Sequence, residues 1–323
     1  MAKKTENNSV KSINARALEY YDMDQLSDVV KGASFEIEQL ENGNFHADLF
    51  SAAFIKGGLD RGRYNRTTFT KGIFSEEYMT FGFLLDAHEE TRFNGKTLQK
   101  YDMMLGNENL TVDYYLPPDS TWTTFQVKRD DLYKTNIILP NRESMVYTLD
   151  EKIKSTFARK VSHIFTLVEG MRDNPDTSLN SELIYNYLLS LYTYAIDQSN
   201  SCVHLKRNES LLLARKIYAY LHEHAAEPVQ MIHLTHLTGK SERSIERIFK
   251  QHFGVSPYSY LKLHRLHLIR HKLMKQNRMD SVNITSIAMD NGFMHMGYFG
   301  SEYKKLFNET PSETLKHHND SLT

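Results

Sequence analysis

Cysteine and long apolar runs are nearly absent from this chain, and both absences limit what it can be. The 323 residues include one cysteine, Cys202, which excludes an internal disulfide and is too little for a cysteine-based metal site. No apolar stretch approaches the ~18 uncharged residues that indicate a membrane span. Residues 1–12 are rich in Lys, Asn and Ser without an apolar core, so no signal peptide is expected. The sequence predicts a cytoplasmic protein without membrane contact.

Sequence patterns typical of enzymes are also missing. The chain has no Gly-rich phosphate loop, no nucleophile elbow and no obvious acid pair. His46 and His88 do not form the close histidine pair, with a downstream partner, that a cupin-type metal centre needs. We therefore expect no catalytic residue, no cofactor and no metal site. An enzyme activity of the first 200 residues stays open as an alternative, but no residue pattern indicates which reaction it would be.

Charge is distributed unevenly along the chain. Residues 201–323 contain 17 Lys and Arg against 11 Asp and Glu, a net charge of +6, whereas the first 200 residues have a net charge of −7. Twelve of the 15 histidines also lie after residue 200. The length permits two domains with separate cores. The basic residues 201–323 therefore favour a domain that binds a polyanion, attached to an acidic N-terminal part that does not.

The region from about Phe35 to Pro140 is predicted to be β-rich. Aromatic-rich segments at 45–50 and 78–85 are separated by turn residues such as Gly57-Gly58 and Pro117-Pro118. Short strands with Gly and Pro turns are typical of a β-sandwich or a cupin-like barrel.

Two helices are predicted after Pro140, because apolar residues then recur at three- and four-residue spacing. They run from about Met145 to Val168 and from about Leu179 to Ala195, on either side of a break at residues 174–176. The helices could cover the β-domain core or offer an apolar face to a second subunit, and the sequence favours neither.

These patterns predict four segments. Residues 1–30 form a polar, partly disordered tail, and residues 31–197 a domain for effector sensing, dimerisation or both. Residues 198–208 are polar and aperiodic, as in an interdomain linker. Residues 209–323 form an all-α domain.

The last hundred residues contain a near-repeat with an offset of 54 residues. The matching pairs are Ile245/Phe299, Phe249/Tyr303, Phe253/Phe307, Pro257/Pro311 and Leu261/Leu315. Each copy is predicted to form a short helix, a tight turn and a second helix, with the aromatic residues in its core. Two such units in tandem suit a protein that places helices in successive grooves of DNA.

The second helix of the first copy, from Glu242 to Phe253, is predicted to have a charged outer side. That side carries Arg243, Glu246, Arg247 and Lys250. Arg can bind guanine through two hydrogen bonds and Glu can accept one from cytosine. Ser241 is predicted to cap the helix by accepting an amide hydrogen bond.

Two stretches carry a family resemblance. The first is residues 241–250 followed by Phe253-Gly254-Val255-Ser256-Pro257. The second includes Ile284, Ile287-Ala288, Gly292-Phe293, Phe299, Tyr303-Lys304, Phe307 and Thr310-Pro311-Ser312. Together they resemble the AraC/XylS family of bacterial transcription regulators, over about residues 209–316.

The resemblance implies two helix-turn-helix units joined by a long helix, with recognition helices in consecutive major grooves roughly 34 Å apart. The family's base-facing positions correspond to Arg243, Glu246, Arg247, Met296, Gly297, Gly300 and Ser301. We add His295 as a base contact. The phosphate contacts that we expect are Ser241, Lys250, Lys304 and Lys305.

The second recognition helix departs from the family pattern. Ser301 stands where the family usually has Arg. Gly297 and Gly300 each cost the helix roughly 0.5–1 kcal/mol relative to Ala. Because no bidentate base reader is present there, we predict that the first unit supplies most of the sequence specificity, while the second adds positioning and salt-dependent affinity.

Three histidines on the joining helix, His264, His267 and His271, share one side of it. A zinc site could use such spacing. No nearby cysteine or well-spaced carboxylate completes one, so we interpret them as exposed residues on a DNA-facing helix.

A basic cluster in the β-rich region also has two interpretations. Its members are Arg61, Arg63, Arg66 and Lys71. They could bind an anionic effector, but a solvated hairpin edge is favoured, since charged side chains protect edges from pairing.

The sequence thus predicts an α+β protein that binds duplex DNA and regulates transcription in response to a small molecule or partner. By the resemblance it is an activator that contacts RNA polymerase, and it acts as a homodimer. The alternative is a constitutive dimeric regulator whose N-terminal domain is only a dimerisation scaffold.

Overall fold

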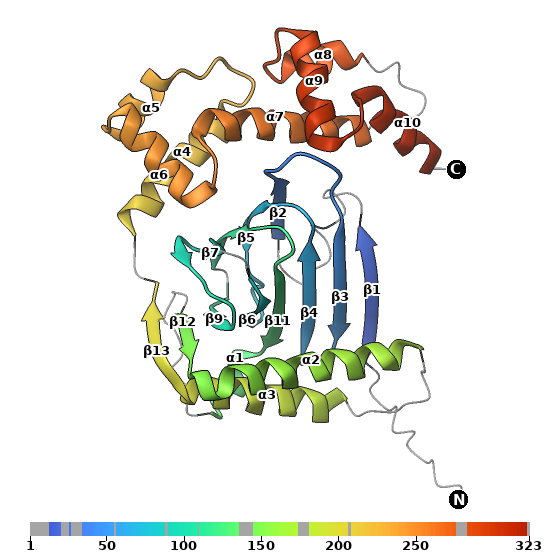
Figure 1. Ribbon diagram of the computed structural model, residues 1–323, viewed down its shortest axis with the longest axis vertical. Helices are drawn as coiled ribbons and strands as arrows, with labels where there is room; N and C mark the ends of the chain where they lie inside the picture. The colour runs from blue at the N-terminus through green and yellow to red at the C-terminus, as the bar shows by residue number, and fades with distance from the viewer. Residues whose placement is uncertain are drawn as a thin grey trace, which may run out of the picture.

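The computed structural model describes residues 13–20, 26, 34–54, 56–87, 90–108, 110–135, 145–173, 181–205, 208–275 and 283–321. His88 and the predicted break at residues 174–176 lie outside these ranges. Figure 1 shows a β-rich domain with two long helices along one side and a group of C-terminal helices at the opposite end. Within the described ranges, no helix is both long and apolar enough to cross a membrane.

The β-rich domain contains two antiparallel sheets. The larger has the order β1 (Asn14–Tyr20), β3 (Ala47–Ala53), β4 (Gly57–Tyr64), β11 (Thr121–Val127), β6 (Met79–Asp86), β9 (Asp102–Gly106), β12 (Met145–Leu149) and β13 (Ser199–His204). The smaller has the order β2 (Ser34–Gln39), β5 (Thr68–Ile73), β10 (Thr111–Leu116), β7 (Arg92–Phe93) and β8 (Lys96–Thr97). Leu49, Trp122 and Met104 of the larger sheet share a buried cluster with Phe93 and Val112 of the smaller. The predicted β-rich N-terminal domain is therefore confirmed.

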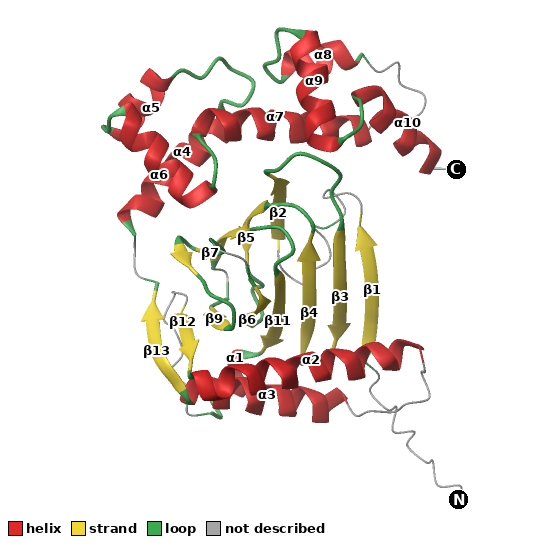
Figure 2. Ribbon diagram, viewed as in Figure 1, coloured by secondary structure: helices red, strands yellow, loops and turns green. Residues whose placement is uncertain are grey.

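Two long helices cover the other face of the larger sheet (Figure 2). They are α2 (Glu151–Asp173) and α3 (Ser181–Asp197); a short helix, α1 (Arg129–Leu132), follows β11. Phe157 of α2 packs against Phe83 with ring centroids 4.8 Å apart, and Tyr192 of α3 packs against Phe81 at 5.1 Å. The inner faces of these helices thus cover the β-domain core, as one of the two interpretations predicted.

Two segments adopt more regular structure than their polar sequences indicated. β1 lies inside the predicted tail and pairs with β3, and β13 lies inside the predicted linker and pairs with β12. Both are edge strands of the larger sheet, so backbone hydrogen bonds to one neighbour hold them without an alternating apolar pattern. The aperiodic linker predicted for residues 198–208 is wrong for the six residues of β13.

The C-terminal domain is all helical, as predicted. Its helices are α4 (Glu209–Glu223), α5 (Met231–Thr238), α6 (Glu242–Phe253), α7 (Pro257–Met274), α8 (Ile284–Asp290), α9 (Met296–Phe307) and α10 (Pro311–Ser321). The 54-residue repeat extends to the backbone, since α6 ends at Gly254 (φ 79°) and α9 ends at Asn308 (φ 57°). Left-handed residues at these matching positions turn the chain into α7 and α10.

Candidate nucleic-acid interface

α6 has a buried inner side and a charged outer side. Ile245, Phe249 and Phe253 are at most 1% exposed and belong to the core of the first unit. The exposed side chains are Arg243, Glu246, Arg247 and Lys250. In the part of the chain that the structure describes, no acidic side chain forms an ion pair with these cations. The predicted placement of this face is confirmed, while its contact with DNA stays a prediction.

The caps of α6 and α7 differ from each other. Ser241 is the N-cap residue of α6 as predicted, but its hydroxyl donates to Ser244 Oγ at 3.0 Å and accepts no amide hydrogen bond, so the predicted capping bond is wrong. Ser256 caps α7 as predicted, accepting from the Ser259 amide at 3.2 Å, with Pro257 in the first turn.

α9 offers a less polar outer side than α6. His295, Gly297 and Ser301 are exposed, whereas Met296 is half-buried and packs on the core of the second unit. Two further residues on this surface were not predicted: Met294 is 75% exposed and Tyr298 is 54% exposed. Both lie outside the buried stripe of α9 and outside the near-repeat, so neither pattern singled them out.

The lysines after this surface are not equivalent. Lys305 Nζ donates to Glu302 Oε1 at 2.7 Å, and Lys262 of α7 also binds the Glu302 carboxylate. Hydrogen bonds from Lys262 and Lys305 lower the pKa of Glu302. Lys304 is exposed and pairs with none of the described acidic residues. Of the two phosphate contacts predicted on α9, Lys304 is therefore more available than Lys305.

α7 joins the two units through Arg265. Its guanidinium donates to the carbonyls of Ala225 and Glu227, each at 2.6 Å, and to that of Gly292 at 3.3 Å. The first two carbonyls belong to the turn after α4 and the third to the turn between α8 and α9. One side chain thus ties both units to the joining helix, which fixes their separation.

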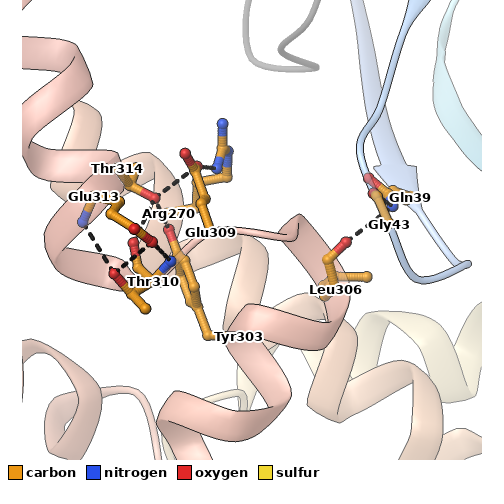
Figure 3. A network of polar contacts seen from close by, with 9 residues as sticks. All are labelled: Gln39, Gly43, Arg270, Tyr303, Leu306, Glu309, Thr310, Glu313 and Thr314. Carbon is orange, nitrogen blue, oxygen red and sulfur yellow. Dashed lines mark hydrogen bonds and ion pairs between the residues drawn. The ribbon is translucent and has the colours of Figure 1, made fainter.

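A second polar network attaches α10 to α9 and α7 (Figure 3). Tyr303 Oη lies 2.8 Å from Thr314 Oγ1, and Thr314 donates to Glu309 Oε1 at 2.7 Å. Arg270 of α7 forms an ion pair with the same Glu309 carboxylate. The second unit is thereby fixed to α7 independently of its apolar core.

The β-rich domain packs directly on this assembly. Phe69 of β5 lies 4.5 Å from Phe253 and 6.0 Å from Tyr218, measured between ring centroids. The Gly43 amide, after β2, donates to the Leu306 carbonyl at 3.0 Å (Figure 3). It also donates to the Lys305 carbonyl at 3.2 Å. The domain therefore contacts both helix-turn-helix units.

The histidines of α7 face this interdomain contact. His264 is 7% exposed and its Nδ1 lies 2.6 Å from Glu38 Oε1, while His267 Nε2 lies 3.0 Å from the Gln39 carbonyl. The prediction of exposed, DNA-facing histidines is wrong for both, because α7 turns this side toward β2.

The basic cluster of the β-rich region is dispersed. Arg61 pairs with Glu169 of α2, Arg63 pairs with Asp119 at 3.0 Å, and Lys71 Nζ lies 3.7 Å from the ring centroid of Tyr218. Each of these three cations has a different partner. They therefore do not form one anion-binding site, and they do not all lie on a solvated hairpin edge.

Comparisons with known proteins agree with the helical domain. Residues 234–317 match a model described as a helix-turn-helix domain. The chain is 31% identical to the XylDLEGF operon transcriptional activator 2 of Pseudomonas putida over 103 residues, 32% of this chain and 65% of that protein. It is 26% identical to the HTH-type transcriptional activator RhaS of Enterobacter sp. (strain 638) over 58% of this chain and 64% of that protein.

One solved structure of similar sequence is a probable AraC family transcriptional regulator from Rhodopseudomonas palustris CGA009. The identity is 30%, the TM-score 0.31, and the match covers 33% of this chain and 98% of that one. The chain spans between about one third and two thirds of the length of the curated relatives it matches first. In its C-terminal domain, the chain thus contains a helix-turn-helix domain similar to those of AraC/XylS-type transcription regulators.

Proposed function

We propose that the protein binds specific duplex DNA through α6 and α9 and activates transcription. The observation that carries this proposal is the exposed cationic side of α6, which pairs with no acidic side chain among the described residues and lies on a firmly packed helix. The matching helix of the second unit is α9, whose outer side is less charged, and Arg265 holds the two units at a fixed spacing. The activator names of the relatives support the direction of regulation, which implies contact with RNA polymerase.

Base reading and phosphate binding are divided between the units in this proposal. Arg247 reads bases in one major groove, while Lys304 contributes mainly charge at the other. Tyr298 and Met294 add apolar contacts to the second groove, for example with thymine methyl groups. In this proposal the DNA backbone crosses α7 at the open groove between the units, which Tyr258 and Tyr298 border.

Two substitutions test this division. Arg247→Ala is expected to cost about 1–3 kcal/mol on the preferred site and to relax base preference in one half-site only. Lys304→Ala is expected to weaken binding evenly across sequences and to lower the salt slope by about one unit. Both are measured by DNA binding to a set of single-base variants at several salt concentrations.

Lys152→Ala is the matched control, because Lys152 is an exposed lysine on α2, in the other domain. It should change neither the affinity nor the salt slope. If Lys304→Ala scrambles base preference more than Arg247→Ala, the assignment of specificity to the first unit is incorrect.

The same proposal places an effector between the two sheets of the β-rich domain. The cavity there is lined mainly by apolar side chains, including Leu49, Phe93, Val112 and Trp122. Tyr114 also lines it, and its buried hydroxyl has no hydrogen-bond partner among the described residues. These features suit a small, largely apolar molecule with one polar group that bonds to Tyr114.

A thermal-shift screen of small apolar acids, alcohols and amides tests this site. A ligand at a hundred times its Kd is expected to stabilise the chain by about 2.7 kcal/mol. Tyr114→Phe keeps the shape of the cavity and should reduce that shift for a ligand that bonds to the hydroxyl. A chain that responds to no ligand would support the alternative of a constitutive scaffold.

Dimerisation belongs to both alternatives. The outer side of α3 exposes Leu183, Tyr187 and Tyr194, at 63%, 42% and 57%. Their spacing forms one stripe, which a second copy of α3 would cover in a two-fold contact. Sedimentation of Leu183→Glu against the unchanged chain decides this, since the charge should shift the equilibrium to monomer.

A further inference from the structure

Three metal-ligating side chains meet where the β-rich domain contacts the C-terminal helices. They are Glu38 at the end of β2, His222 on α4 and His264 on α7. One ligand atom of each lies within 4.8 Å of the other two. Glu38 is 8% exposed and the two imidazole rings lie 3.7 Å apart at their centroids, so the group is compact and shielded from solvent.

We infer that this trio binds a divalent transition-metal ion, for which Zn²⁺ has the best chemical match. Two imidazole nitrogens and one carboxylate oxygen form a donor set that Zn²⁺ uses, with a fourth position left for water. Ca²⁺ and Mg²⁺ prefer oxygen ligands throughout, so they suit this set poorly.

The geometry requires only small movements. At bond lengths of about 2.0–2.2 Å, ligand atoms of a tetrahedral site lie roughly 3.3–3.5 Å apart. The His264 Nδ1–Glu38 Oε1 distance of 2.6 Å must therefore increase, and any separation longer than about 3.5 Å, up to the limit of 4.8 Å, must decrease. Changes of about 1 Å lie within the reach of side-chain rotation.

A hydrogen-bond network holds the ligands near one another without a metal ion. Tyr260 donates to Glu38 Oε2, and its oxygen lies 2.8 Å from His222 Nε2. Metal binding would displace the proton between His264 and Glu38 and replace the bond between His222 and Tyr260. The Tyr260 hydroxyl stays beside the carboxylate, where it orients this ligand as outer-sphere groups do in metal sites.

Lys71 limits the affinity of the site. Its ammonium lies over the Tyr218 ring, and its charge acts on both Glu38 and His222. Burial lowers the pKa of Lys71, but a protonated Lys71 still repels a cation. A moderate affinity is therefore expected, and Lys71→Met should raise it.

The position of the site gives the ion a function. Glu38 comes from the β-rich domain and both histidines come from the C-terminal domain, so a bound ion would hold the two domains in this arrangement. The inference concerns metal binding and does not rest on the proposed DNA binding, which is measured separately.

Titration of the full chain with Zn²⁺, and with Co²⁺ as a coloured substitute, tests the inference. We expect one equivalent to bind, with a tetrahedral visible spectrum for Co²⁺. His222→Gln and His264→Gln should each weaken binding at least tenfold. The matched control is His236→Gln, because His236 is an exposed histidine on α5 and should leave binding unchanged.

Three results would overturn the inference: absence of binding, binding unaffected by both His222→Gln and His264→Gln, or equal loss in the control. Circular dichroism in chelator shows whether each variant is folded. Should a histidine variant unfold, X-ray absorption of the unchanged chain with Zn²⁺ decides the question. Scattering from two imidazoles supports the site, and scattering from fewer than two contradicts it.

Discussion

Phe253→Ala is expected to lower the free energy of unfolding by about 3–5 kcal/mol, which is typical of a buried Phe truncated in a core. Phe253 is 1% exposed, and its ring stacks on Phe249 at 4.4 Å and on Tyr218 at 5.3 Å between centroids. The loss should be large because these rings come from α4 and α6 and cannot close the cavity without moving a helix. Urea unfolding followed by circular dichroism measures it.

The same residue also reports on the contact between the domains. Phe69 of the β-rich domain lies 4.5 Å from Phe253 between ring centroids. A double-mutant cycle with Phe69→Ala should give a coupling of about 0.5–1.5 kcal/mol, as for other aromatic pairs. Additive effects would contradict the packing of the β-rich domain on α6.

Phe307→Ala is the matched substitution in the second unit, 54 residues further on. Phe307 is 9% exposed and its ring contacts Tyr303 and His267, both of the C-terminal domain, whereas Phe253 contacts a ring of the β-rich domain. It should destabilise less than Phe253→Ala and show no coupling to Phe69→Ala. If Phe307→Ala coupled to Phe69→Ala as strongly as Phe253→Ala does, the coupling would not reflect direct contact between the Phe69 and Phe253 rings.

The helical domain was largely predictable from sequence because its signals are local. Ile245, Phe249 and Phe253 repeat at helical spacing. Gly254 indicates where the helix ends, because glycine readily adopts the left-handed conformation found at helix C-termini. The same spacing located the exposed face of Arg243 and Arg247. An amphipathic helix reveals its buried side through residues three and four apart, so no distant partner is needed to find it.

The interdomain contact was not predictable in the same way. His264 was assigned to an exposed side because its partner, Glu38, lies 226 residues earlier in the chain. The sequence predicts Lys305 as a phosphate contact, but Lys305 donates to Glu302, which also binds Lys262. The sequence predicts a linker where edge strand β13 lies. An edge strand is held by backbone hydrogen bonds to one neighbour, so its side chains need not alternate between apolar and polar. For His264 and β13 the deciding partner is distant in sequence or belongs to the backbone, whereas Lys305 pairs with a side chain three residues away.

A buried carboxyl in the β-rich domain leads to the second large effect. Asp60 of β4 is 4% exposed and accepts a hydrogen bond from Thr124 at 3.1 Å. Burial raises its pKa to about 6, although hydrogen bonds from Ser51 and Thr124 partly oppose the shift. An unfolded Asp has a pKa near 3.9. The folded state therefore favours the protonated form, and the stability that this provides is present below pH ~3.9 and lost as pH rises through ~6.

Asp60→Asn removes this dependence, because the amide is neutral at every pH and keeps an oxygen for the Thr124 hydroxyl. A difference of about two pKa units corresponds to roughly 3 kcal/mol. The variant should therefore be more stable than the unchanged chain by up to that amount at pH 8, and the gain should shrink as pH falls toward 4. Asp48→Asn, at an exposed position on neighbouring β3, should change stability by no more than about 0.5 kcal/mol at either pH. Urea unfolding at pH 5 and pH 8 measures both variants. An Asp60→Asn gain that is equal at the two pH values would mean that Asp60 stays ionised in the folded chain, and that water or a cation reaches it between the strands.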